Sequence, residues 1–177
     1  MRIIAGSLKG HHFVSPRGRH THPMSDKMRG AVFSILGDIS GLTVLDAFAG
    51  SGALSFEAIS RGAVGVLAID FDRMAVETMK RNCRELTLTD KVHVLKATIQ
   101  GWSHHNEDKC FDIILADPPY DQIPFYDIEK LPKHLNTNGT FVLSWPGRQQ
   151  LPTLHNLGLI QVKDYGDGQL AFYKKVR

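Results

Sequence analysis

The consecutive residues Asp117-Pro118-Pro119-Tyr120 combine a carboxylate, two rigid rings and an aromatic side chain. The two prolines remove two backbone donors and fix φ near about −65°, so the segment is stiff and rich in hydrogen-bond acceptors. An ionised Asp117 and the carbonyl of Pro118 are two such acceptors, and the ring of Tyr120 is a flat stacking surface. This arrangement suits a planar base that carries an amino group. Accepting both N–H bonds favours a pyramidal nitrogen, whose lone pair is then free for nucleophilic attack.

A second candidate site is the small-residue turn that begins at Asp46 and contains Gly50 and Gly52. Small residues let the backbone turn tightly and approach a ligand at a helix N-terminus. Asp70 ends the next apolar segment, where an acid can accept hydrogen bonds from both ribose hydroxyls of a nucleotide-like cofactor. Ser55 stands where the dinucleotide fingerprint needs its third Gly or an Ala, and Asp46 suits a cationic group better than a pyrophosphate. These features favour S-adenosylmethionine (SAM), which carries an ammonium and a sulfonium but no phosphate.

Both segments also have simpler interpretations. The glycine-containing turn can serve packing alone, and the Pro-Pro segment can be a rigid turn with a capping Asp. The two segments each follow an apolar strand-like stretch, however, and open α/β sheets bind ligands at the carboxyl ends of their strands. We therefore expect the two segments to face each other.

The pattern of apolar residues supplies the strands that must position these sites. Strand-like and helical segments alternate from residue 42 onward, which is typical of a parallel sheet with helices on both faces. The predicted strands are 43–48, 64–69, 92–95, 111–116 and 140–144, the predicted helices are 53–61, 72–86 and 125–135, and a final hairpin comprises 159–163 and 170–174. We predict an α/β fold with a doubly wound, mostly parallel, Rossmann-like sheet of seven strands.

The first part of the chain differs in composition from the rest. Short strands at 2–5 and 12–14 predict a β-hairpin, and Ser25 is a candidate N-cap for a helix that runs to about Leu36. Residues 1–29 hold six Lys and Arg against one acid, a net charge of +5, whereas the remaining residues sum to −2. We predict a basic N-terminal extension over 1–41 and an α/β domain over 42–177. The charge indicates either a polyanionic partner or a solvated segment.

The whole chain resembles the RsmD family, bacterial enzymes that methylate guanine N2 in 16S ribosomal RNA of the small subunit. The resemblance covers nearly the full length, and Asp117 to Tyr120 match the [DNS]-P-P-[YF] motif of amino-group methyltransferases. The other matching segments are Arg2-Ile3-Ile4-Ala5-Gly6, Asp26–Leu36, Phe48-Ala49-Gly50-Ser51-Gly52-Ala53-Leu54 with Glu57-Ala58, Ser60-Arg61-Gly62-Ala63 and Tyr165-Gly166-Asp167.

The resemblance implies a class I SAM-dependent methyltransferase that contains no metal. It implies that Asp117, Pro118, Pro119 and Tyr120 are the catalytic residues. The implied cofactor-binding residues are Asp46, Phe48, Gly50, Ser51, Gly52, Asp70, Phe71, Ala97 and Thr98, and the candidate RNA-binding residues are Arg2, Arg17, Arg19, Lys27 and Arg29. Lys96 replaces an acid that the family often has near the adenine, so adenine recognition is assigned to Ala97 and Thr98.

Two other functions remain open. Because Asp-Pro-Pro-Tyr also fits adenine chemistry, the chain can be an adenine-N6 methyltransferase acting on DNA or RNA. It can also be a catalytically silent module that binds SAM or RNA. The adjacent pairs His11-His12 and His104-His105 lack the spacing of a metal site. We expect a monomeric cytoplasmic protein with no membrane segment, whose partner is ribosomal RNA or the small ribosomal subunit.

Overall fold

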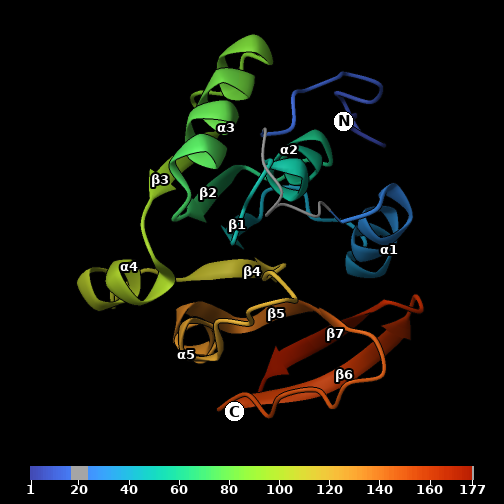
Figure 1. Cartoon of the computed structure of the whole chain (residues 1–177), viewed down its shortest axis with the longest axis vertical. Coiled ribbons are helices and arrows are strands. Elements are labelled where there is room, and N and C mark those ends of the chain that lie inside the picture. The colour runs from blue at the N-terminus through green and yellow to red at the C-terminus, as the bar shows by residue number, and fades with distance from the viewer. Residues whose placement is uncertain (17–23, 177) are drawn as a thin grey trace.

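The computed structural model describes residues 1–16 and 24–176, and within them the apolar segments form one sheet of seven strands (Figure 1). The strand order is β3-β2-β1-β4-β5-β7-β6. The pairs from β3 to β5 are parallel, and β7 pairs antiparallel with both β5 and β6. The predicted fold class is therefore confirmed. The strands are β1 (Thr43–Ala47), β2 (Gly65–Asp70), β3 (Val92–Lys96), β4 (Phe111–Ala116), β5 (Leu135–Pro146), β6 (Leu157–Asp164) and β7 (Gly168–Lys175).

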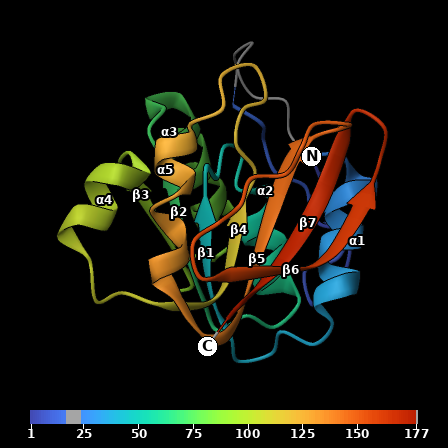
Figure 2. The same cartoon turned by 90° about the horizontal axis from the view of Figure 1, so that it is seen from below.

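Helices cover both faces of the sheet because side chains alternate along each strand. Val44 of β1 points to one face, where it joins a core cluster with α1 (Asp26–Leu36), α2 (Ala53–Ser60) and α3 (Arg73–Glu85). Leu45 points to the other face, where it joins residues of α4 (Ile99–His105), α5 (Phe125–Ile128) and the 3-10 helix η1 (Leu131–His134). Figure 2 shows α4 and α5 on the left and α1 on the right. The doubly wound arrangement thus follows from the alternation.

Side-chain caps set the starts of three helices. The side chains of Ser25 and Asp72 accept hydrogen bonds from Met28 N and Ala75 N, as their positions predict. Thr98 caps α4 in the same way by accepting from Gly101 N. Helix α4 is absent from the predicted elements, because its short, polar sequence carries no apolar stripe.

The predicted helix 125–135 is interrupted at Pro132, which lacks a backbone N–H, and the structure divides this segment into α5 and η1. The structure differs from the predicted elements at one further place. The predicted N-terminal hairpin is reduced to one antiparallel bridge between Arg2 and His12. The reason is that the N–H groups of Ile4 and Ala5 donate to the side chain of Glu57 instead of to another strand.

The N-terminal segment packs onto α2 and α3 through buried polar groups. Ser60 O accepts from Ser7 N at 2.7 Å, and the Ser60 hydroxyl donates to Ala5 O at 2.5 Å. Gly6 has φ +86°, and a Cβ on it would lie 1.8 Å from Ser60 O, so this contact requires glycine. Residues of 1–41 such as Ile3 and Phe33 belong to the same core cluster as β1.

No helix among the described residues combines the length and apolar character needed to cross a lipid bilayer.

Candidate functional site

Three carboxylates lie at the carboxyl edge of the parallel strands. Asp46 belongs to β1, Asp70 ends β2 and Asp117 follows β4. Ala47 of β1 is in register with both Ile69 and Ala116, so the two loops that follow β1 and β4 leave the sheet side by side. The predicted sites are therefore brought together.

The turn after β1 has the backbone conformation that its small residues allow. Phe48 has φ +66°, Gly50 +52° and Gly52 +80°, all in the left-handed region. A Cβ on Gly52 would lie 2.8 Å from Met79 Cγ, so Gly52 permits close packing beneath the turn. A Cβ on Gly50 would meet no atom closer than Phe48 O at 3.9 Å, so Gly50 borders open space. The turn thus presents an open backbone surface before α2, while Ser51 is buried.

Asp70 fixes this turn from the neighbouring strand. One carboxylate oxygen accepts from Gly50 N at 2.7 Å, and the other accepts from Asp72 N at 2.8 Å. Burial raises the pKa of Asp70, and the two backbone donors oppose that rise. Each oxygen retains lone pairs that can accept from ribose hydroxyls.

Asp46 is fully buried and only partly satisfied. Oδ2 accepts from the Ser55 hydroxyl at 2.5 Å, whereas Oδ1 has no hydrogen-bond partner among the described residues. Burial raises the pKa of Asp46 to about 7, and the charges of Asp117 and Asp70 add to this rise. A buried acceptor of this kind is costly unless a donor reaches it. An ammonium group would satisfy Oδ1 and stabilise the charged form, so the site fits a cationic ligand.

The ends of β2 and β3 border the turn on its other side. Phe71, directly after Asp70, is 65% exposed and offers an aromatic surface. Ala97 N donates to Asp70 O at 3.0 Å, which places the start of the β3–α4 loop beside Asp70. Thr98 is exposed, but its side chain already caps α4. The predicted residues Phe71, Ala97 and Thr98 therefore lie together at one end of the site.

The segment after β4 contains the predicted catalytic residues. Pro118 is buried, Pro119 is half-buried and Tyr120 is 38% exposed. Burial raises the pKa of Asp117 to about 6, and interaction with the Ser144 side chain opposes that rise. Asp117 is therefore mostly anionic at neutral pH, as an acceptor of N–H groups must be.

The hydroxyl of Tyr120 is engaged as well as its ring. Its oxygen lies 2.5 Å from the Ser144 hydroxyl oxygen, and burial raises the pKa of Tyr120 to about 12. Neither Ser144 nor Ser55 is among the predicted site residues. The contact of Ser144 joins two different loops and strands of the sheet, and the contact of Ser55 depends on how α2 folds back onto β1, so no local pattern marks either residue.

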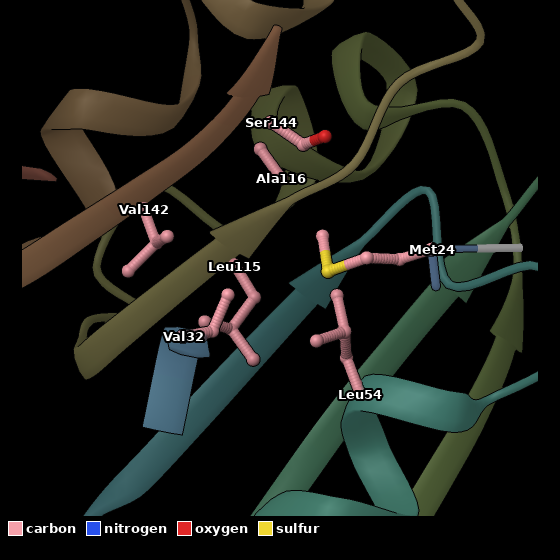
Figure 3. Close-up of a pocket in the computed structure, with 7 residues that line it drawn as sticks. All are labelled: Met24, Val32, Leu54, Leu115, Ala116, Val142 and Ser144. Carbon is pink, nitrogen blue, oxygen red and sulfur yellow. The ribbon is translucent and has the colours of Figure 1, made fainter. Parts of the chain in front are cut away.

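A small pocket lies beneath this segment, between α1, α2, β4 and β5 (Figure 3). Ala116, which precedes Asp117, contributes to its wall, and Ser144 contributes a hydroxyl group. The other lining residues are apolar: Met24, Val32, Leu54, Leu115 and Val142. The space among these side chains does not admit a water molecule, so the pocket is a narrow packing gap beside Ser144.

The candidate RNA-binding residues differ in their contacts. Arg2 is exposed and pairs with Asp26 at 3.3 Å, and Lys27 lies over the ring of Tyr165, 5.8 Å from its centroid. Arg17 and Arg19 lie outside the described residues.

The prediction that Arg29 contacts RNA is wrong. Its side chain is fully buried, where it donates to Asp26 at 2.8 Å and to Arg2 O at 2.9 Å. A guanidinium in this position contacts groups inside the fold and is not available at the surface. Its spacing on the helix does not reveal this, because Asp26 and Glu57 neutralise it from two different elements.

The chain is similar to several known proteins over most of its length. The sequence pattern of a family described as "Conserved hypothetical protein 95" matches residues 1–174. YlbH of Bacillus subtilis, provisionally named an rRNA methyltransferase, is 32% identical over 182 residues, which cover 99% of each chain. Ribosomal RNA small subunit methyltransferase D of Escherichia coli K12 is 31% identical over 125 residues, which cover 68% of this chain and 60% of that relative.

Two solved structures have the same overall arrangement. The yhhF protein of Escherichia coli, provisionally named a methyltransferase, has a TM-score of 0.87 at 27% identity, covering 99% of this chain and 98% of its own. The hypothetical protein TTHA0928 of Thermus thermophilus has a TM-score of 0.85 at 25% identity, covering 98% of this chain and 99% of its own.

Proposed function

Because the chain belongs to the RsmD family of methyltransferases, we propose that it transfers a methyl group from SAM to the N2 amino group of a guanine in small-subunit ribosomal RNA. The observation that carries the proposal is the meeting of two loops at one edge of the sheet. One loop follows Asp46 of β1, which has an unpartnered buried oxygen, and the other holds Asp117 and Tyr120. A cationic cofactor and an amino-bearing base would thus lie side by side.

The residues around the first loop fit SAM. Asp46 would accept from its ammonium group and Asp70 from its ribose hydroxyls, while Phe71, Ala97 and Thr98 would border the adenine. Gly50 leaves open space where the ligand would approach the backbone. When bound, SAM supplies an electrophilic methyl group on a sulfonium.

The residues of the second loop would hold and orient the nucleophile. Asp117 would accept one N–H of the target amine and the Pro118 carbonyl the other, while Tyr120 would stack on the base. The carboxylate matters most as the nitrogen gains positive charge, so its contribution is larger in the transition state than in the ground state. Holding the amine in line with the methyl group is a proximity effect of roughly 7–11 kcal/mol in favourable cases.

Ribosomal RNA is the proposed substrate for two reasons. Relatives of the chain are named ribosomal RNA methyltransferases, and the N-terminal part of the chain is basic. Bases in RNA loops can be unstacked and placed against an aromatic side chain. Arg2 and Lys27 are exposed cations that can contact phosphates beside the site. We place the protein in the cytoplasm, as a monomer, with free ribosomal RNA or the small subunit as its partner.

A direct test uses the purified protein, methyl-labelled SAM and small-subunit ribosomal RNA, supplied free or in the assembled subunit. After a single turnover, the RNA is digested to nucleosides and the labelled product identified by mass spectrometry. Labelled N2-methylguanosine is the expected product. Labelled N6-methyladenosine would show that the base is adenine and not guanine. SAM binding without any transfer to RNA would show that the protein is a binding module and not a methyltransferase.

A further inference from the structure

Ser144 connects the two chemically important side chains of the Asp-Pro-Pro-Tyr segment. It lies near the carboxyl end of β5 and is only 2% exposed. Ala116 of β4 is in register with Leu143 of β5, so Asp117 and Ser144 are the next residues on two paired parallel strands. The Ser144 oxygen lies 2.5 Å from the Tyr120 hydroxyl, and the Ser144 side chain also interacts with the Asp117 carboxyl.

The chemistry of the three groups sets the direction of these interactions. An ionised carboxylate only accepts hydrogen bonds, so in its interaction with Asp117 the Ser144 hydroxyl can act only as the donor. Its oxygen is then free to accept from the Tyr120 hydroxyl. The result is a chain in which Tyr120 donates to Ser144 and Ser144 donates to Asp117, an arrangement whose members strengthen one another in a low-dielectric site.

The neighbours of Tyr120 keep its hydroxyl at Ser144. A Cβ on Gly168 of β7 would lie 3.0 Å from the Tyr120 hydroxyl oxygen and 3.2 Å from Met28 Cε. Gly168 therefore leaves just enough room for the phenol end of the ring. The exposed part of the ring remains available for stacking.

We infer that Ser144 is a positioning residue for methyl transfer, whose hydroxyl holds the Asp117 carboxylate and the Tyr120 ring in one fixed geometry around the target amine. The inference rests on the proposed function, because Asp117 and Tyr120 contact the base in that function. Ser144 itself touches neither base nor cofactor.

The charges around Asp117 explain why a donor is needed there. Asp46 of β1 faces Asp117 and raises the cost of a second charge, and Asp70 of β2 adds to the negative field at Asp46. Tyr120 is the other titratable group in contact with the chain, and it stays neutral because its pKa is raised to about 12. Without the Ser144 donor, Asp117 would be protonated at higher pH, and its neutral form would be a weaker acceptor for an amine that gains positive charge.

The test compares three variants in single-turnover methyl transfer over a range of pH. Ser144→Ala removes the hydroxyl, whereas Ser144→Thr keeps it and adds one methyl group among the side chains drawn in Figure 3. Ser103→Ala is the matched control, because Ser103 is also buried and its hydroxyl bonds to His134, away from the site.

Ser144→Ala should lower kcat about tenfold or more, the effect of losing a hydrogen bond to a charged group. SAM affinity should stay unchanged and the acid limb of the kcat profile should move to higher pH. Ser144→Thr should recover most of the rate, and Ser103→Ala should alter neither kcat nor its pH profile. A folded Ser144→Ala protein with the wild-type rate and profile would overturn the inference.

A second measurement does not depend on activity. The carboxyl group of Asp117 can be titrated by carbon-13 NMR in the free protein, with its signal identified by its loss in Asp117→Asn. The midpoint should rise in Ser144→Ala and return in Ser144→Thr, and an unchanged midpoint would show that Ser144 does not hold Asp117. A wild-type protein that transfers no methyl group to RNA would instead refute the proposed function, whatever the titration shows.

Discussion

At the scale of single residues, the three carboxylates of the site differ in which of their oxygens are bonded. Both oxygens of Asp70 accept from backbone N–H groups, whereas Asp46 keeps one oxygen without a partner among the described residues. Asp117 interacts with a side-chain hydroxyl. Asp70 therefore fixes a turn, Asp46 has one oxygen that lacks a donor, and Asp117 is positioned to accept from a substrate.

The unpartnered oxygen of Asp46 predicts that one substitution has opposite effects on stability and on SAM binding. A folded-state pKa raised to about 7 means that the folded protein binds this proton more tightly than the unfolded chain. The associated stability is complete below about pH 4 and is lost as the pH rises through about 7. Asp46→Asn cannot ionise, so without SAM it should raise Tm at pH 8 by roughly 5 °C and change it little at pH 4.

The same variant should bind SAM more weakly, because an amide cannot neutralise an ammonium group. Melting curves at the two pH values and calorimetry with SAM measure both effects. A lower Tm for Asp46→Asn at pH 8 would contradict the assignment of a buried, poorly satisfied charge.

Asp70 supports a second prediction, on the cofactor. Asp70→Ala should weaken SAM binding by about 1–3 kcal/mol, the usual cost of hydrogen bonds to a charged group. The wild-type protein should bind SAM and its demethylated product in calorimetry and bind NAD far more weakly. Asp90→Ala, at an exposed position, is the control and should bind SAM like the wild type. Tight NAD binding with no SAM binding would refute the cofactor assignment.

Asp117 supports a third prediction, on the chemical step. Asp117→Asn should lower kcat strongly with little change in SAM affinity, since an amide accepts less well as the amine becomes cationic. Wild-type kcat should fall as the pH drops below about 6, where Asp117 becomes protonated, and the variant should lack this limb. Single-turnover transfer and melting curves test this together. Near-wild-type transfer by a folded variant would exclude the mechanism.

The sequence predicts the members of the site but not the contacts that tune them. Asp70 and Asp117 stand out because each ends or follows an apolar segment, and Asp46 stands out because it interrupts one just before the small-residue turn. Ser144 and Ser55 do not stand out, since a serine within an apolar segment gains its role only from the partner that the fold brings to it. The hydroxyl of Tyr120 is a similar case: the sequence favours the ring alone, whereas the structure shows that the hydroxyl is bonded.

At the scale of elements, prediction succeeds where local signals and periodicity agree. Helix α3 has both a capping Asp72 and an apolar stripe, and its predicted bounds differ from the observed ones by one residue at each end. Helix α4 has a cap at Thr98 but only seven residues and no stripe. Its existence depends on Trp102 packing under the sheet, which is a tertiary contact.

The attachment of the N-terminal segment to α2 supports a fourth prediction. Glu57 is fully buried, accepts from Ile4 N and Ala5 N, and faces Arg61 at 2.7 Å and Arg29 at 3.8 Å. Glu57→Gln keeps the shape but leaves Arg61 without its carboxylate and Arg29 with Asp26 alone. Removing one partner of a buried ion pair costs about 3–5 kcal/mol, so the free energy of unfolding should fall by that amount.

Denaturant unfolding measures this change. Glu77→Gln is the control, because it removes an exposed pair with Arg73 and should cost about 0–1 kcal/mol. Equal effects of the two substitutions would show that the buried contacts of Glu57 contribute nothing special.

At the scale of the whole molecule, the uneven charge predicts how RNA is bound. Replacing Arg17, Arg19 and Lys27 together with Gln should weaken RNA binding and leave SAM binding intact. Each phosphate contact removed should reduce the slope of log affinity against log salt by about 0.7–0.9. Lys80→Gln, on the exposed side of α3, should not change the slope. An unchanged slope in the triple variant would show that the basic segment is only a solvated surface.

The position of β7 between β5 and β6 has a consequence for synthesis of the protein. β7 follows β6 along the chain but lies between β6 and β5 in the sheet. β6 therefore has no strand to pair with while β7 is still within the ribosomal exit tunnel. Gly168 of that strand also borders the hydroxyl of Tyr120. The part of the site that contacts Tyr120 therefore cannot form while the chain is still being made. We expect the protein to become active only after β7 has emerged and paired with β5 and β6.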